Sequence, residues 1–244
     1  MTTIAVSKSH SVAPRSIAPK SASRAAAQPG TASSTAALAV RAKVGLIGAI
    51  ASVPPITVLH MSATGPVEPT TWTISDYVVT LPYGIPLFAM TTGALAIGAV
   101  VMANGLTRLA GTRTVRALLV AWAAALVAAA VFPTNLRGTP QNISSNVHLI
   151  AGAVVFALLP VAGWLLARWQ RSTFGPTVMV TALRTVSMLS GLLSTALIVN
   201  RMPGVIGLPE LLPPGILQRA AGAVEIALLA AAAASVLRAA RRSH

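Results

Sequence analysis

Three charged residues interrupt apolar stretches of this sequence: Arg184, Arg219 and Glu225. An ionisable side chain is costly to bury in hydrocarbon, so within a membrane it usually faces the protein interior or water. Ser187 follows Arg184 by three residues and Gln218 precedes Glu225 by seven, so each pair shares one face of a helix. We therefore expect an intramembrane polar seam of Arg184, Ser187, Gln218 and Glu225 between two neighbouring helices.

The depth of the two charged groups leaves their pairing open. At about 1.5 Å per residue, Arg184 and Glu225 differ in depth by roughly 8 Å on antiparallel helices. Either tilt brings the guanidinium to the carboxylate, or Arg184 extends to the inner membrane surface. Arg219, about one turn from the opposite end of its helix, is expected to extend outward in the same way.

A second set of polar residues falls at helix ends and in connections on one side of the membrane. His60, Asp76 and His148 are the residue types that bind zinc, but no local spacing such as two histidines four residues apart joins them. A hydrogen-bonding role at the membrane surface is the alternative for each. A broader outer polar cluster, suited to a lipid headgroup, a small solute or a partner protein, comprises Asp76, Asn135, His148, Arg201, Glu210 and Arg219.

The sequence gives little support to other kinds of catalytic or cofactor chemistry. There is no cysteine, which excludes disulfides, thiolate metal ligands and cysteine nucleophiles. No glycine-rich phosphate loop follows a strand-like segment, and helical spacing brings together no other catalytic set. The sequence predicts no catalytic residue and no cofactor, and it favours a protein that is not an enzyme.

Membrane helices are the elements that must position these residues. The chain is 55% hydrophobic with only 9% charged residues, whereas a soluble domain carries about a quarter. The net charge of +14 would suit nucleic acid. The basic residues, however, form short clusters between apolar runs rather than one basic face, so no nucleic-acid partner is expected.

Six apolar runs approach the length of about 20 residues that crosses a hydrocarbon core. They predict an all-α, polytopic bundle of six transmembrane helices near residues 44–61, 85–106, 117–132, 147–167, 177–199 and 216–237. Pro54 and Pro55 should kink the first helix. Residues 1–40, rich in Ser, Ala and Pro and without an acid, predict a disordered basic tail ahead of a membrane domain at 41–244; an organellar transit peptide is the alternative.

The basic residues also predict the orientation, because they favour the cytoplasmic side. With the N-terminus inside, 14 of the 18 basic residues fall on the cytoplasmic side, two outside and two within helices. Both termini are therefore expected in the cytoplasm. Membrane lipids, and a partner membrane protein, are the expected partners.

Glycines in the predicted helices mark expected points of close approach, since small residues let helix backbones meet in lipid. The expected positions are Gly93, Gly98, Gly152, Gly163, Gly191 and Gly222.

Three short motifs carry a family resemblance. They are Ile74-Ser75-Asp76-Tyr77, Phe132-Pro133-Thr134 with His148 opening the next helix, and Gln218-Arg219 with Glu225. Together they resemble a six-helix membrane protein family, bacterial and mostly actinobacterial, filed as domain of unknown function 998. The resemblance covers about residues 40–242 and implies a bacterial plasma membrane, without implying a reaction. That family usually has an aspartate where this chain has Asn135, which puts any role of that carboxylate in doubt here.

Three functions remain open. A non-enzymatic binding or accessory protein would gather the outer polar cluster on one face. A small transporter or channel would show a continuous polar path along Arg184 and Glu225. An intramembrane hydrolase would bring His60, Asp76 and His148 within metal-binding distance.

Overall fold

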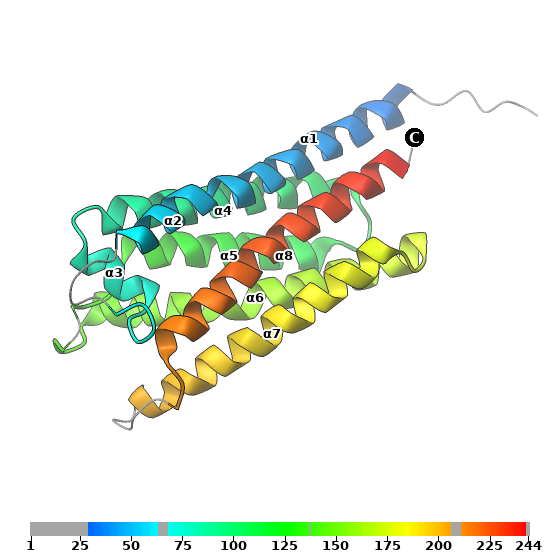
Figure 1. Cartoon of the computed structure of the whole chain (residues 1–244). Coiled ribbons are helices and arrows are strands. Elements are labelled where there is room, and N and C mark those ends of the chain that lie inside the picture. The colour runs from blue at the N-terminus through cyan, green and yellow to red at the C-terminus, as the bar shows by residue number, and fades with distance from the viewer. Residues whose placement is uncertain (1–28, 63–67, 137, 206–210, 243–244) are drawn as a thin grey trace, which may run out of the picture.

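Long helices lie side by side in an elongated bundle in the computed structural model (Figure 1). The structure describes residues 29–62, 68–136, 138–205 and 211–242. The described elements are α1 (Pro29–Ala51), α2 (Val53–Met61), α3 (Ile74–Thr80), α4 (Gly84–Gly105), the 3-10 turn η1 (Leu106–Arg108), α5 (Arg113–Val131), α6 (Ile143–Phe174), α7 (Val178–Val205) and α8 (Pro214–Arg242). No strand occurs within these ranges.

Six stretches of the described chain are long and apolar enough to cross a membrane. They are Thr35–Met61, Gly84–Gly105, Arg113–Val131, Ile143–Phe174, Val178–Arg201 and Pro214–Arg242. The prediction of an all-α bundle with six spans is therefore confirmed. The orientation in the membrane stays a prediction.

The first span differs from its predicted form in two respects. Helix α1 begins at Pro29, so residues 29–40, which we expected in the disordered tail, are helical; their run of alanines is favourable for helix. The expected kink appears as a break at Ser52, after which α2 begins with prolines in its first turn. Prolines are tolerated there because first-turn N–H groups lack helical partners. The rest of the predicted tail, residues 1–28, lies outside the described residues.

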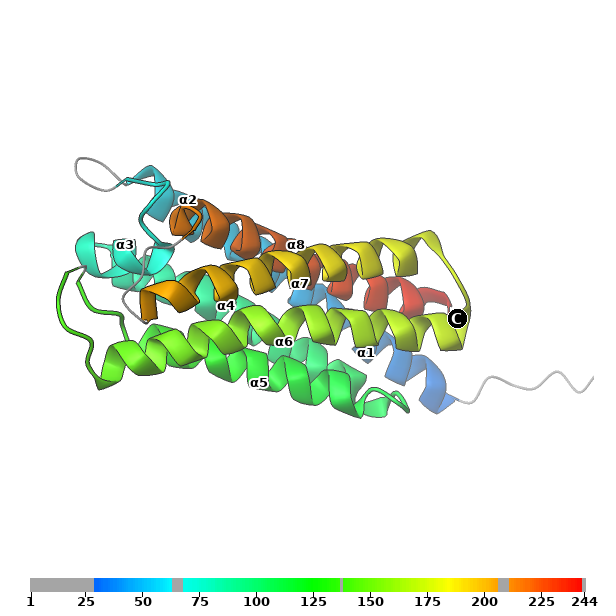
Figure 2. The same cartoon turned by 90° about the horizontal axis from the view of Figure 1, so that it is seen from below.

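Each span packs against its neighbours in sequence, and the last closes on the first. α1 packs on α4, and the series continues through α5, α6 and α7 to α8, which packs back on α1 (Figures 1 and 2). A further contact joins α6 and α8 across the ring. The start of α1 and the end of α8 lie at the same end of the bundle (Figure 1). We call this the terminal end, and the opposite end, where α3 lies, the α3 end.

Side chains fill the ring toward the terminal end. Leu119, Leu166 and Leu183 are buried there in one cluster with Leu228 and Leu229 from the middle of α8. Because these leucines come from α5, α6, α7 and α8, they close the interior of that half.

Two of the expected close approaches are confirmed. A Cβ on Gly98 would lie 3.2 Å from the Gly48 Cα, and one on Gly163 would lie 2.5 Å from the Ser187 Oγ. The missing side chains therefore let α1 approach α4, and α6 approach α7. Gly48, which the sequence analysis did not single out, is the tighter side of the first contact, since its Cβ would lie 2.5 Å from the Ala94 carbonyl oxygen.

The other four expected close approaches are wrong. A Cβ on Gly93, Gly152 or Gly222 would meet nothing within 4 Å, and one on Gly191 would only touch the Pro160 side chain at 3.7 Å. Two of these glycines, Gly152 and Gly222, border empty space inside the bundle.

Candidate functional site

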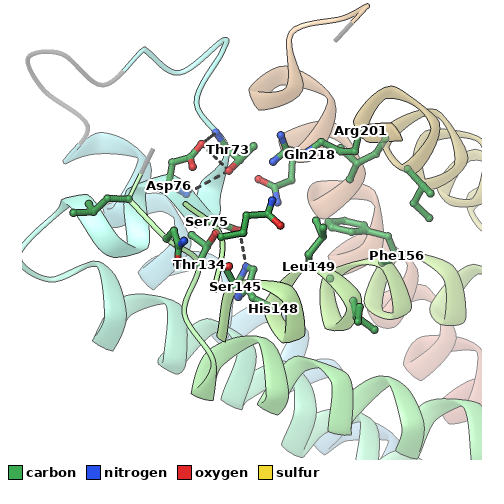
Figure 3. Close-up of a pocket in the computed structure, with 18 of the residues that line it drawn as sticks. Thr73, Ser75, Asp76, Thr134, Ser145, His148, Leu149, Phe156, Arg201 and Gln218 are labelled. Atoms are coloured by element: carbon green, nitrogen blue, oxygen red, sulfur yellow. Dashed lines mark hydrogen bonds between the residues drawn. The ribbon is translucent and has the colours of Figure 1, made fainter. Parts of the chain in front are cut away.

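Two cavities occupy the α3 end of the bundle. The end cavity, of about 480 Å³, lies between the start of α3, the connection from α5 to α6, and α6, α7 and α8 (Figure 3). The inner cavity, of about 530 Å³, lies between α2, α4, α5, α6 and α8. Both volumes fall within the range of about 300–1,000 Å³ typical of small-molecule sites.

The two cavities share part of their lining. The shared residues are Ser75, His148, Gly152, Phe156 and Gln218. A side-chain movement in this common wall would therefore change both cavities together.

His148 holds the common wall together through both nitrogens of its ring. Its Nδ1 lies 2.8 Å from the Ala129 carbonyl oxygen and 2.9 Å from that of Phe132, while its Nε2 lies 2.9 Å from the Ser75 Oγ (Figure 3). Carbonyls only accept, so Nδ1 carries a proton and donates. In the neutral ring Nε2 then accepts from the Ser75 hydroxyl. His148 thus ties the start of α6 to the end of α5 and to α3.

Asp76 caps α3. Its Oδ2 accepts hydrogen bonds from the Thr73 backbone N–H at 2.7 Å and from the Thr73 hydroxyl at 2.8 Å, while the Asp76 N–H donates to the Thr73 Oγ1. This reciprocal capping box explains why so short a helix forms here. The carboxylate also lines the end cavity (Figure 3).

Gln218 connects α8 to the same short helix. Its Oε1 accepts a hydrogen bond of 2.6 Å from the Ile74 N–H, the first residue of α3. The expected seam residue therefore lies at the α3 end rather than beside Glu225, although both line the inner cavity.

The structure brings four of the six residues of the expected outer polar cluster to the end cavity. They are Asp76, Asn135, His148 and Arg201. The Asn135 amide donates to the Pro140 carbonyl, which stabilises the connection from α5 to α6. Glu210 lies outside the described residues.

Arg219, the remaining cluster residue, lines the inner cavity instead. Its Nη1 donates to the carbonyl oxygens of Trp72 and Gly215, both at 2.8 Å, and its guanidinium carbon lies 4.9 Å from the centroid of the Tyr77 ring. Its Nε and Nη2, like the Tyr77 hydroxyl, are buried without a hydrogen-bond partner. Burial raises the pKa of the Tyr77 hydroxyl, which keeps that group protonated.

Glu225 lies deep in the inner cavity and is only 4% exposed. Its Oε2 accepts from the Trp122 indole N–H at 3.2 Å and its Oε1 from the Ser190 hydroxyl at 3.1 Å. Both donors are neutral, and they come from α5 and α7. Sequence reasoning missed them, although Ser190 lies three residues after Ser187 on the same helix face.

Arg184 does not pair with Glu225. Its guanidinium carbon lies 4.7 Å from the Trp164 ring centroid. Ser187 donates to the Leu183 carbonyl and lines a separate cavity of about 370 Å³ with Gly191 and Ser194, between α6 and α7. The expected seam is thus divided, because Gln218 and Glu225 line the inner cavity whereas Arg184 and Ser187 do not. Ser190 makes the hydrogen bond between α7 and Glu225.

The weak metal candidate is not assembled in this structure. His60 lines the inner cavity with its Nδ1 donating to the Ile56 carbonyl at 2.7 Å, whereas Asp76 lines only the end cavity. Within the described residues no three His, Asp or Glu side chains lie together in a way that could hold a metal ion.

Residues 46–235 match the model of a family described as a protein of unknown function, DUF998. Neither the curated proteins nor the solved structures contain a match.

Proposed function

The chain belongs to the DUF998 family, whose function is unknown, and from its own cavities we propose that it is a non-enzymatic membrane protein that binds a small amphiphilic molecule. The observation that supports this most directly is the common wall between a cavity with many polar groups and one with mostly apolar walls. An amphiphile likewise consists of a polar part joined to an apolar part.

The inner cavity suits the apolar body of such a molecule. Ile56, Leu95, Leu126 and Val155 are among its walls, and burying hydrocarbon against them is favourable by roughly 25 cal/mol per Å². Gly152 and Gly222 enlarge the space, since neither carries a side chain.

The end cavity suits the polar part. Arg201 and Gln218 line it together with Asp76, and hydroxyls of Thr134 and Ser145 add donors and acceptors (Figure 3). A few convergent polar groups beside an apolar pocket are typical of sites that orient a ligand. A lipid headgroup or a polar solute group would be held here.

We place the α3 end on the outside of a bacterial plasma membrane, with both termini in the cytoplasm. The support is the distribution of charge, because basic residues favour the cytoplasmic side. At or near the terminal end lie Arg41, Lys43, Arg113, Arg116, Arg168, Arg171, Arg238, Arg241 and Arg242, against Arg201 and Arg219 toward the α3 end. The ligand would then come from the outer leaflet or from outside the cell.

A transporter is the second candidate, and Glu225 favours it, since buried acids line many transport pathways. The packing of the terminal half weighs against an open path in this conformation, because leucines from α5 to α8 fill the ring there. Binding without transport requires no rearrangement of that half, so it is the simpler function.

Filling the inner cavity tests the proposal. We would measure the binding of Nile red, a neutral apolar fluorophore, to the full chain in nanodiscs, and compare Gly222→Leu with Gly93→Leu. Both glycines have room for a Cβ, but only Gly222 lines the inner cavity. Gly222→Leu should weaken Nile red binding about fivefold or more by occupying the site, and Gly93→Leu should leave it unchanged. Equal binding by the two variants would exclude the inner cavity as the site.

A further inference from the structure

The inner cavity contains one deeply buried acid in otherwise largely apolar surroundings. Glu225 has two oxygens, each with room for about two hydrogen bonds when ionised. The Trp122 indole and the Ser190 hydroxyl occupy one position on each oxygen. Accepting capacity is therefore left over on a side chain that lines an empty space.

No basic residue that the structure describes forms an ion pair with Glu225, and its two hydrogen-bond donors carry no charge. An ionised carboxylate is strongly disfavoured in an apolar interior unless a cation pairs with it. The partner that completes this site must therefore come from outside the chain, as a proton or as a positively charged ligand.

The cavity offers the aromatic surfaces that cations prefer. Trp122, Phe88 and Phe156 all line it together with Glu225. A cation over an aromatic ring is attracted to the negative face of the ring, and most strongly when both are removed from water. A cavity that is lined by one carboxylate and three aromatic rings fits a cation better than a neutral molecule of the same shape.

We propose that the inner cavity binds a lipophilic cation, such as an ammonium or phosphonium group attached to an apolar body, with Glu225 as the counter-charge. This inference rests on the proposed function and deepens it by naming the charge of the ligand. When the cation enters, it takes the place of the proton that otherwise neutralises Glu225.

The other titratable groups that line the cavity leave this arrangement intact. Arg219 lies six residues closer to the α3 end, roughly 9 Å along the helix axis, and donates to the Trp72 and Gly215 carbonyls. His148 and His60 each donate through Nδ1 to a backbone carbonyl. Within the described part of the chain, none of the three forms a hydrogen bond or an ion pair with Glu225. The hydrogen bonds that α5 and α7 make to Glu225 come from Trp122 and Ser190.

A pair of ions with the same shape and opposite charge tests the proposal. Tetraphenylphosphonium and tetraphenylborate would be titrated into the full chain in nanodiscs of neutral lipid, with empty nanodiscs as the background. We expect saturable binding of the phosphonium and no saturable binding of the borate. Equal binding of both ions, or saturable binding of the borate alone, would overturn the inference.

The variant Glu225→Gln removes the charge and keeps the shape. Its affinity for tetraphenylphosphonium should fall about tenfold or more, as expected for loss of one member of a buried charge pair. An unchanged affinity for the phosphonium would contradict the role of Glu225.

The pH dependence provides a readout that needs no variant. Tetraphenylphosphonium keeps its charge at every pH, so any change of its affinity with pH comes from the protein. Because the cation competes with a proton on Glu225, the affinity of the unaltered chain should rise with pH. An affinity that does not change with pH would overturn the exchange of cation for proton.

The two proposals fail in different ways. If Gly222→Leu and Gly93→Leu bind Nile red equally, the inner cavity is not the binding site. If Gly222→Leu alone loses Nile red but Glu225→Gln keeps full phosphonium binding, the cavity binds amphiphiles without regard to their charge.

Discussion

Glycine residues have opposite effects on packing in the two halves of the bundle. In the terminal half, Gly163 on α6 lies against Ser187 and Leu228, and side chains fill the ring. In the α3 half, Gly152 on the same helix faces open space between two cavities. The absence of a side chain tightens one half and hollows the other, so glycine content alone does not indicate close packing.

Leucine at these two glycines should give the largest difference between the halves. Gly163→Leu should destabilise the fold by about 3 kcal/mol, because the new side chain has no room beside Leu228. Gly152→Leu, on the same helix, should cost nothing measurable, because its Cβ meets nothing within 4 Å. Thermal unfolding of both variants in one detergent would measure this. Similar losses in the two variants would show that the α3 half is as tightly packed as the other.

Arg219→Met should give the next largest effect. The guanidinium joins α8 to the connection before α3 through the Trp72 carbonyl, and hydrogen bonds from a charged donor contribute about 2 kcal/mol. We expect a loss of that size, together with faster hydrogen exchange at the backbone amides of residues 68–80. A loss of stability without faster exchange in that segment would mean that Arg219 does not stabilise the α3 end.

The smallest effect concerns Glu68, which precedes α3 in the chain. The Thr70 hydroxyl and N–H donate to its Oε1, and these hydrogen bonds hold the pKa of Glu68 below its ordinary value. A lowered pKa means that the contribution to stability is present above the ordinary pKa and is lost as the pH falls through the lowered one. Carbon-13 NMR of labelled glutamate should show the Glu68 midpoint rising in Thr70→Val. An unchanged midpoint would contradict these contacts.

Hydropathy was sufficient to predict the six spans. In lipid there is no water to bond the backbone N–H and C=O groups, so an apolar segment that crosses it forms a helix. The break in the first span was predicted from its two prolines alone. The helix α3 was missed, because its seven residues are too few for an apolar period. Its capping box was visible as Thr73 followed by Asp76, and that spacing was the available signal.

The site was harder to predict, because its contacts join segments that are far apart in sequence. Helical spacing found Gln218 and Glu225 on one face of α8, and both line the inner cavity. It also grouped Arg184 with them, although Arg184 packs on Trp164 instead. The spacing of residues along a helix shows which of them share a face, but not which neighbouring helix that face contacts. The hydrogen bonds of Glu225 with Trp122 and Ser190 could therefore not be predicted.

The contact between α1 and α8 has a consequence for synthesis. Contacts between distant parts of a chain form only after both parts exist, which makes them late steps of folding. The first span must remain in the lipid without its second neighbour until the last one inserts. Glu225 is carried by that last span, so Trp122 and Ser190 are already in the membrane when the acid arrives. A chain that stops before α8 would lack both the acid and the wall of the inner cavity that α8 contributes.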